Sequence, residues 1–171
     1  MFARENVMVT LKRISSAVQD NKEQTRKMML VRCSLAPLDV ELAQEIDSSL
    51  VYHLFAKDGD KFIPRSELPS SGWPFNFKIP RQNVIFRAAD GIENTREVQA
   101  VDVKGLQTAR GNDDPHITLS FSLLFEVPEP HMAAWLLLTV GDPVAITFDK
   151  MQPSLPITEA RGQEDGDAAT Q

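Results

Sequence analysis

Polar and apolar residues alternate most regularly over residues 116–127, HITLSFSLLFEV. One face of this segment holds only apolar residues: Ile117, Leu119, Phe121, Leu123, Phe125 and Val127. The other face is mostly polar. A period of two residues is that of a β-strand, and one apolar face beside one polar face is typical of an antiparallel sheet on a core. We therefore predict a long antiparallel strand here.

The segments around this strand predict further elements. The turn-forming sequence RGNDDP (110–115) predicts a hairpin with a preceding strand that ends in VDVKGLQTA (101–109). Pro130 suits the first turn of a helix and Gly141 its end, so we expect a helix over 130–140. That segment is apolar on nearly all sides, which predicts deep burial. A strand is expected at 143–150.

The first half of the chain predicts the same order of elements. We expect strands at 7–14 and 28–36, joined by a polar connection over 16–27. A helix over 38–47 follows, because Leu38, Leu42 and Ile46 fall on one helical face. A strand is then expected at 50–57, ended by the turn residues Asp58-Gly59.

Two short motifs suggest that the halves are copies of one unit. VTLKRISSA begins at Val9 and VDVKGLQTA begins at Val101, which is 92 residues later. The pair Ala36-Pro37 matches Val127-Pro128 at a spacing of 91, and 50–57 matches 143–150 at 93. We interpret this as an internal duplication of a β-β-α-β unit, with chance similarity as the alternative.

Both motifs also break strand alternation at the same place. The apolar residues of the first motif are Val9, Leu11 and Ile14, and those of the second are Val101, Val103 and Leu106. A step of three instead of two predicts a β-bulge in each strand. Gly105 suits a bulge position, whereas Arg13 suits it less well.

The fold prediction is an α+β protein that is mainly antiparallel β-sheet, with two buried helices. We expect one globular domain over 1–151, with pseudo-repeats 7–57 and 99–151 and a two-stranded insert at 58–97. The insert's strands are expected at 75–79 and 83–91. Residues 152–171 are polar and acidic, and we expect a disordered tail there.

Composition limits the classes of function. Hydrophobic residues make up 42% of the chain, which is normal for a globular protein. The net charge is −6, which is unlike the basic charge of a dedicated duplex-DNA binder. No signal peptide or membrane span is expected. The only cysteine, Cys33, excludes an intramolecular disulfide and fits a reducing compartment. We expect a cytoplasmic protein of a bacterial host.

The sequence predicts no enzyme, cofactor or metal site. Nucleotide-binding and hydrolase motifs are absent from it. A buried position is expected for Cys33. The least favoured alternative is an acid–base or metal site in which His116 and His131 meet near one sheet edge with Asp113 and Asp114.

Basic residues gather in two places. Lys22, Arg26 and Lys27 lie in the first predicted connection, and Lys78, Arg81 and Arg87 lie around the inserted strands near Trp73 and several phenylalanines. Charges that meet phosphates and rings that stack on bases are typical of single-stranded nucleic-acid binding. The alternative is that the phenylalanines are core residues and that the charged side chains form the solvated opposite face.

The chain resembles small uncharacterised β-rich proteins encoded by phages and prophages. The resemblance lies in VTLKRISSA, in LAPLDVELAQEIDSSLVYHLF and in PHITLSFSLLFEVPEPH followed by VGDPVAITF. It implies a role in a phage or mobile element. We expect a non-enzymatic binding or assembly protein with a protein partner or a homo-oligomeric state. The alternative is an accessory protein that contacts single-stranded nucleic acid, or DNA as a clamp.

Overall fold

The computed structural model describes residues 5–21, 24–68, 73–74, 79–88, 95–111 and 116–150. The strands are β1 (Val7–Asn21), β2 (Gln24–Leu35), β3 (Phe55–Asp58), β4 (Lys61–Pro64), β5 (Trp73–Pro74), β6 (Gln82–Ala88), β7 (Thr95–Arg110), β8 (Ile117–Glu126) and β9 (Pro143–Lys150). The helices are α1 (Val40–Ile46), α2 (Ser48–Leu54) and α3 (Pro130–Leu138). The expected predominance of antiparallel β-structure is confirmed.

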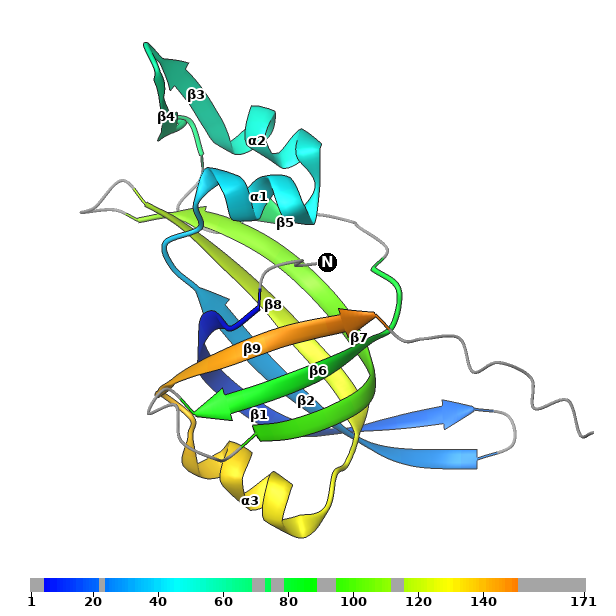
Figure 1. Cartoon of the computed structure of the whole chain (residues 1–171). Helices are drawn as coiled ribbons and strands as arrows, with labels where there is room; N and C mark the ends of the chain where they lie inside the picture. The colour runs from blue at the N-terminus through cyan, green and yellow to red at the C-terminus, as the bar shows by residue number, and fades with distance from the viewer. Residues whose placement is uncertain are drawn as a thin grey trace, which may run out of the picture.

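Six strands close into a barrel. They pair in the order β7-β6-β9-β1-β2-β8, and a further pairing between β7 and β8 joins the two ends of this row (Figure 1). Every pairing is antiparallel. Closure leaves no open sheet edge along the middle of the barrel, which removes a common route to aggregation.

The alternating strand predicted at 116–127 is confirmed and supplies the barrel interior. Leu119, Leu123 and Phe125 are fully buried, and the ring of Phe125 lies 6.5 Å from that of Phe86 on β6. Val127, expected on the same face, lies one residue beyond β8 and is half exposed. The apolar face of the sequence pattern therefore became the inside of a closed barrel.

In chain order the six barrel strands divide into two sets of three, β1-β2-β6 and β7-β8-β9, and the third strand of each set pairs with a strand of the other set. β1 pairs with β2 and β7 pairs with β8, while the third strand of each set pairs with the first strand of the other: β6 with β7 and β9 with β1. The two remaining pairings join strands that have the same position in the two sets: β2 pairs with β8, and β6 pairs with β9. The barrel thus has the connectivity of two intertwined three-stranded units.

Both expected bulges are present. The β1–β2 register shifts between Leu11 and Arg13, and the β7–β8 register shifts between Lys104 and Gln107. Gly105 lies inside the second bulge with φ +62°, the left-handed conformation that glycine tolerates best. In β1 the extra residue is Lys12, so Arg13 is not the bulged residue.

Helices cover the two ends of the barrel (Figure 1). α1 and α2 lie at one end together with the small β3–β4 sheet, and α3 lies at the other. The strand expected at 50–57 is wrong: residues 48–54 form α2, and only Phe55–Asp58 is a strand, paired with β4 outside the barrel. Asp47 caps α2 by accepting a hydrogen bond from the Ser49 N–H at 2.8 Å.

The deep burial expected for the 130–140 helix is also wrong. α3 packs Met132 and Leu136 on the barrel, whereas Leu137 and Leu138 are 57% and 81% exposed. A helix that closes the end of a barrel has only one face to bury, so its outer apolar residues meet solvent.

The polar connection expected at 16–27 is mostly strand. β1 continues to Asn21 and β2 begins at Gln24, so the two strands extend as a hairpin that projects from the barrel (Figure 1). Val18 on this hairpin is 66% exposed. Because both faces of the hairpin meet solvent, its sequence lacks the alternation that marks a half-buried strand.

Of the two inserted strands, the second is confirmed as β6, which is part of the barrel rather than an addition to its edge. The first falls mostly on residues outside the described ranges, as does the tail at 152–171. Among the described helices, none combines the length and apolar character needed to cross a membrane.

Candidate cleft at the free edge of β7

The barrel wall opens at the end covered by α3. β7 pairs with β8 from Asp102 onward, but β7 itself begins at Thr95. β8 stops at Glu126, and its last link to β2 is a hydrogen bond from the Val127 N–H to the Lys27 carbonyl at 3.1 Å. The prolines of the following sequence, VPEP, cannot donate ladder hydrogen bonds, so the chain turns away into α3.

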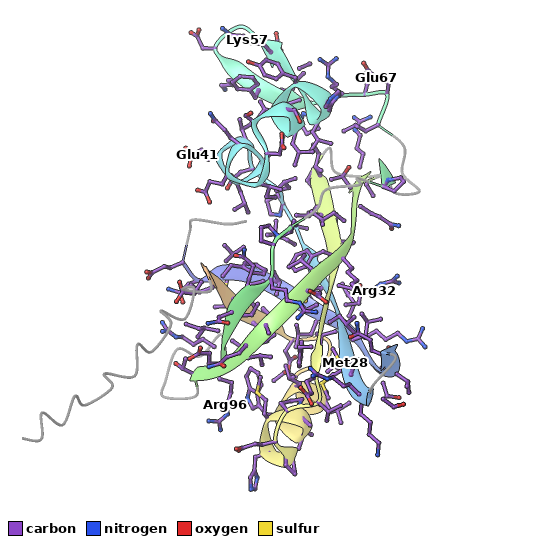
Figure 2. The ribbon with its side chains drawn as sticks, turned by 90° about the vertical axis from the view of Figure 1, so that its right-hand side faces the viewer. Met28, Arg32, Glu41, Lys57, Glu67 and Arg96 are labelled. Carbon is purple, nitrogen blue, oxygen red and sulfur yellow. The ribbon has the colours of Figure 1, made fainter. Side chains whose placement is uncertain are left out.

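This divergence leaves a cleft of about 920 Å³ between β7, the β1–β2 hairpin and the connection from β8 to α3. Its lining residues are Gln19, Arg26, Met28, Arg81, Arg96, Glu97, Val98, Gln99, Ala100, Glu126, Val127, Pro128, Glu129 and Met132. Figure 2 shows two of them, Arg96 and Met28, on different strands close to α3. The volume is in the range of cavities that hold ligands.

One edge of β7 faces this cleft without a strand partner in the described part of the chain. Residues 95–98 pair with β6 on their other edge, for example Arg96 with Phe86 and Val98 with Val84. In an antiparallel strand, alternate residues direct their N–H and C=O groups to each side. Some backbone groups of this segment therefore point into the cleft.

Arg96 is the least exposed of the cleft's arginines. It stands opposite Phe86, which is fully buried in the barrel, and directly paired residues share one face of a sheet. The Arg96 side chain therefore leaves β7 on the inner face. Its Nε atom is buried and has no hydrogen-bond partner in the described structure. An unpaired buried donor of this kind lowers the stability of the free protein.

Arg26 and Arg81 bring the two basic groups of the sequence to this one cleft. Both are exposed. Arg81 donates from Nε to Asp102 Oδ1 at 2.8 Å, and this contact raises the pKa of the Arg81 guanidinium. Arg81 stays charged, and the Asp102 carboxylate offsets this charge toward a ligand. Arg26 lines the cleft without an ion-pair partner among the described residues.

The other expected nucleic-acid-binding residues are not brought together here. Lys27 and Arg87 are exposed but do not line the cleft. Lys22, Lys78 and the side chain of Trp73 lie outside what the structure describes. Phe86 is a core residue, as the alternative interpretation expected.

The cleft has charges of both signs. Its lining includes three arginines and three glutamates, and the glutamates, Glu97, Glu126 and Glu129, are all exposed. None of the lining residues that the structure describes is aromatic. A polyanion that stacks its bases needs a positive groove and ring faces. The cleft lining that the structure describes instead suits a ligand that offers backbone N–H and C=O groups for hydrogen bonding, together with charges of both signs.

A second irregularity shapes the β7 edge. The register with β6 shifts between Gln82 and Val84, because β7 places Gln99 and Ala100 opposite the single residue Asn83. Ala100 has φ +54°, a conformation that costs an L-residue about 1–2 kcal/mol. Its N–H donates to Asn83 Oδ1 at 3.4 Å. Gln99 and Ala100 of this irregularity both line the cleft.

The least favoured alternative, an enzyme site, finds no support in the geometry. His116 lies one residue before β8 and His131 five residues after it, so the two histidines lie at opposite ends of a strand of about 33 Å. They do not meet near one edge, and Asp113 and Asp114 lie outside the described residues. No group of three metal-ligating side chains occurs within the described ranges.

Cys33 is the core residue that the sequence predicted. It is fully buried inside the barrel, and burial raises the pKa of its thiol to about 12. A thiolate nucleophile is therefore strongly disfavoured at neutral pH.

Arg96 is one of the cleft residues that our sequence interpretation missed. It lies two residues before Val98, so it continues the inner-face alternation of β7 at a position where an apolar residue is the rule. The sequence does contain a signal for this residue, because a charged side chain stands at an inward-facing position of the strand. Its meaning depends on the cleft, which only the divergence of β7 from β8 creates.

No known protein family, curated protein or solved structure matches this chain.

Proposed function

We propose that this chain is a non-enzymatic binding protein that holds an extended polypeptide segment of a partner protein in the cleft. The observation that supports this is the edge of β7 at residues 95–100, which has no strand partner in the described part of the chain and faces a cleft of about 920 Å³. An added strand pairs its backbone with such an edge and places alternate side chains in the pocket beside it. The mixed charges of the cleft favour a polypeptide over a polyanion.

The apolar lining residues suit the same ligand. Met28 and Met132 are buried at the cleft, and methionine side chains adapt to varied apolar partners. Val127 is half exposed at the rim. An extended segment with an apolar side chain on one face and polar side chains on the other would cover these groups.

The test is a selection of peptides from a displayed library of random twelve-residue sequences, with the full chain immobilised. We expect peptides that bind with dissociation constants on the order of micromolar. Gln99→Trp fills the cleft from an exposed position and should weaken binding at least tenfold. Lys104→Trp, on the same strand but outside the cleft, is the matched control. Failure to recover binders, or equal binding by Gln99→Trp, would contradict the proposal.

The alternative functions have distinct outcomes. Binding of a twenty-residue oligothymidylate that falls steeply with salt, and that is lost in Arg26→Gln and Arg81→Gln, would favour single-stranded nucleic acid. A defined multimer by light scattering that Gln99→Trp converts to monomer would identify the occupant as a second copy of this chain.

An origin in a phage or mobile element, and a place in the cytoplasm of a bacterial host, are part of the same proposal. The resemblance to phage and prophage proteins supports the origin, and the single cysteine, Cys33, fits a reducing compartment such as the cytoplasm.

We also propose that the barrel arose by duplication of a three-stranded unit. Val31 of β2 pairs with Leu123 of β8, and these residues are 92 positions apart, as are the first residues of the two similar motifs. In this interpretation the counterpart of β9 is β6 rather than residues 50–57. The segment between β2 and β6 is then an enlarged version of the connection that contains α3.

A further inference from the structure

We infer that the cleft selects a peptide that places a carboxylate on Arg96, and this inference rests on the proposed function. The relevant features are the position of Arg96 inside the mouth of the barrel, its buried unpaired Nε and the distribution of acidic groups around it.

The guanidinium has no acidic partner in the described part of the protein. Arg81 has Asp102 at 2.8 Å and Arg65 has Glu67 at 3.6 Å, but no ion pair joins Arg96 to another residue within the described ranges. Glu97 is its neighbour in sequence, yet consecutive residues of a strand point to opposite faces. An arginine that is partly buried and unpaired favours a carboxylate, whose two oxygens match its forked donors.

The acidic residues at the rim of the cleft determine which peptide residues can flank that carboxylate. Glu97, Glu126 and Glu129 are exposed at the rim, so a uniformly acidic ligand would meet like charges. A central acidic residue flanked by basic or neutral residues meets Arg96 in the interior and the glutamates outside. The expected recognition sequence is therefore an extended segment with one acidic position, not an acidic tract.

The experiment uses the peptides recovered from the random library. They should share one acidic position. Changing that residue from Glu to Gln in a recovered peptide should weaken its binding to the natural chain by roughly ten- to hundredfold, as expected for a hydrogen-bonded charge pair. The same change should alter binding to Arg96→Gln less than twofold. Arg87→Gln, on the outer face of β6, is the matched control and should behave like the natural chain.

The outcomes separate this inference from the proposed function. Peptides that bind in the cleft, as judged by Gln99→Trp, but lack a shared acidic position would overturn the inference and leave the function intact. A Glu-to-Gln effect of equal size in Arg96→Gln would also overturn it. If no peptide binds in the cleft, both proposals fail. Because Arg96→Gln alters the barrel mouth, Arg96→Lys serves as a second variant and should retain an intermediate preference for Glu.

Discussion

Arg96 lies directly opposite Phe86 in the pairing of β7 with β6, so a guanidinium and a fully buried ring leave the sheet on the same face. Four residues further along β7, Ala100 adopts a left-handed conformation at the kink beside the same cleft. A buried donor without a partner and a strained backbone both lower stability. The two features occur together where β8 leaves β7 and the barrel wall opens, and this coincidence is the physical basis for locating binding there.

Replacing Arg96 by an apolar residue of similar length should stabilise the fold. Arg96→Met removes the unpaired buried Nε and keeps the packing of the stem, so we expect the free energy of unfolding to rise by about 1 kcal/mol. Arg87→Met on the exposed outer face should change it by less than about 0.5 kcal/mol. Urea denaturation followed by circular dichroism measures both. A clear loss of stability in Arg96→Met would mean that the guanidinium has a partner in solution.

The kink in β7 predicts a gain on substitution by glycine. Ala100→Gly relieves the positive φ and should stabilise the protein by about 1 kcal/mol. Ala145→Gly, in the regular part of β9, should instead destabilise it by about 0.5–1 kcal/mol. The two variants are compared by denaturation midpoints. A destabilised Ala100→Gly would show that the left-handed conformation is not the native one.

At the bulge in β7, replacing Gly105 should lower the stability of the fold instead of raising it. Apart from the adjacent residues, nothing in the described structure lies within 4 Å of the place that a Cβ would take, so Gly105→Ala should fold without a clash and lose about 1 kcal/mol through its φ of +62° alone. Lys104→Ala is the exposed neighbour for comparison. Equal thermal midpoints for the two variants would argue against the bulge.

The buried thiol of Cys33 should be inert in the folded protein. Because burial raises its pKa to about 12, the thiol stays protonated and iodoacetamide at pH 8 should modify the folded chain roughly a thousandfold more slowly than the urea-unfolded chain. The unfolded thiol ionises near its ordinary value of 9.0, so this group's contribution to stability is complete below about pH 9 and is lost as the pH rises toward 12. Rapid modification under native conditions would contradict the burial.

The cap of α2 should be sensitive to acid. Hydrogen bonds from the Ser49 side chain and backbone lower the pKa of the Asp47 carboxyl below 3.8. The carboxylate therefore stabilises α2 above pH 4, and this stabilisation is lost as the pH falls through the lowered value. Asp47→Ala should lose about 1 kcal/mol at pH 7. Asp47→Asn keeps a capping oxygen and should lose less and show a weaker dependence on acid. Thermal melts from pH 2 to 7 distinguish the two.

Short sequence patterns correctly predicted the features that depend on the geometry of a single strand. The alternation in β8 and the three-residue steps at Leu11 and Val103 gave the buried face and both bulges, because strand geometry imposes those spacings on any chain. The projecting part of the β1–β2 hairpin has two solvated faces, so no alternation marked it. In α2, the cap residue Asp47 and the spacing of Leu50 and Leu54 were the available signals, and the apolar run concealed them.

Barrel closure and the cleft depend on pairing between distant segments, which no short pattern encodes. Arg81 and Arg26 were selected from composition, yet their common position arises from the pairing of β2 with β8 and of β6 with β7. The role of Arg96 follows from the point at which β8 leaves β7. That point is Leu124, where the pairing of β8 with β7 ends, and it is remote from Arg96 in sequence.

Amide hydrogen exchange along β7, measured with and without a cleft-binding peptide, tests the central claim most directly. Pairing of a peptide with the free edge should slow exchange at alternate residues of the segment 95–100 by tenfold or more, while amides between β7 and β8 change little. Unchanged exchange over 95–100 with the peptide bound, or protection confined to α3 or the other end of the barrel, would contradict the account.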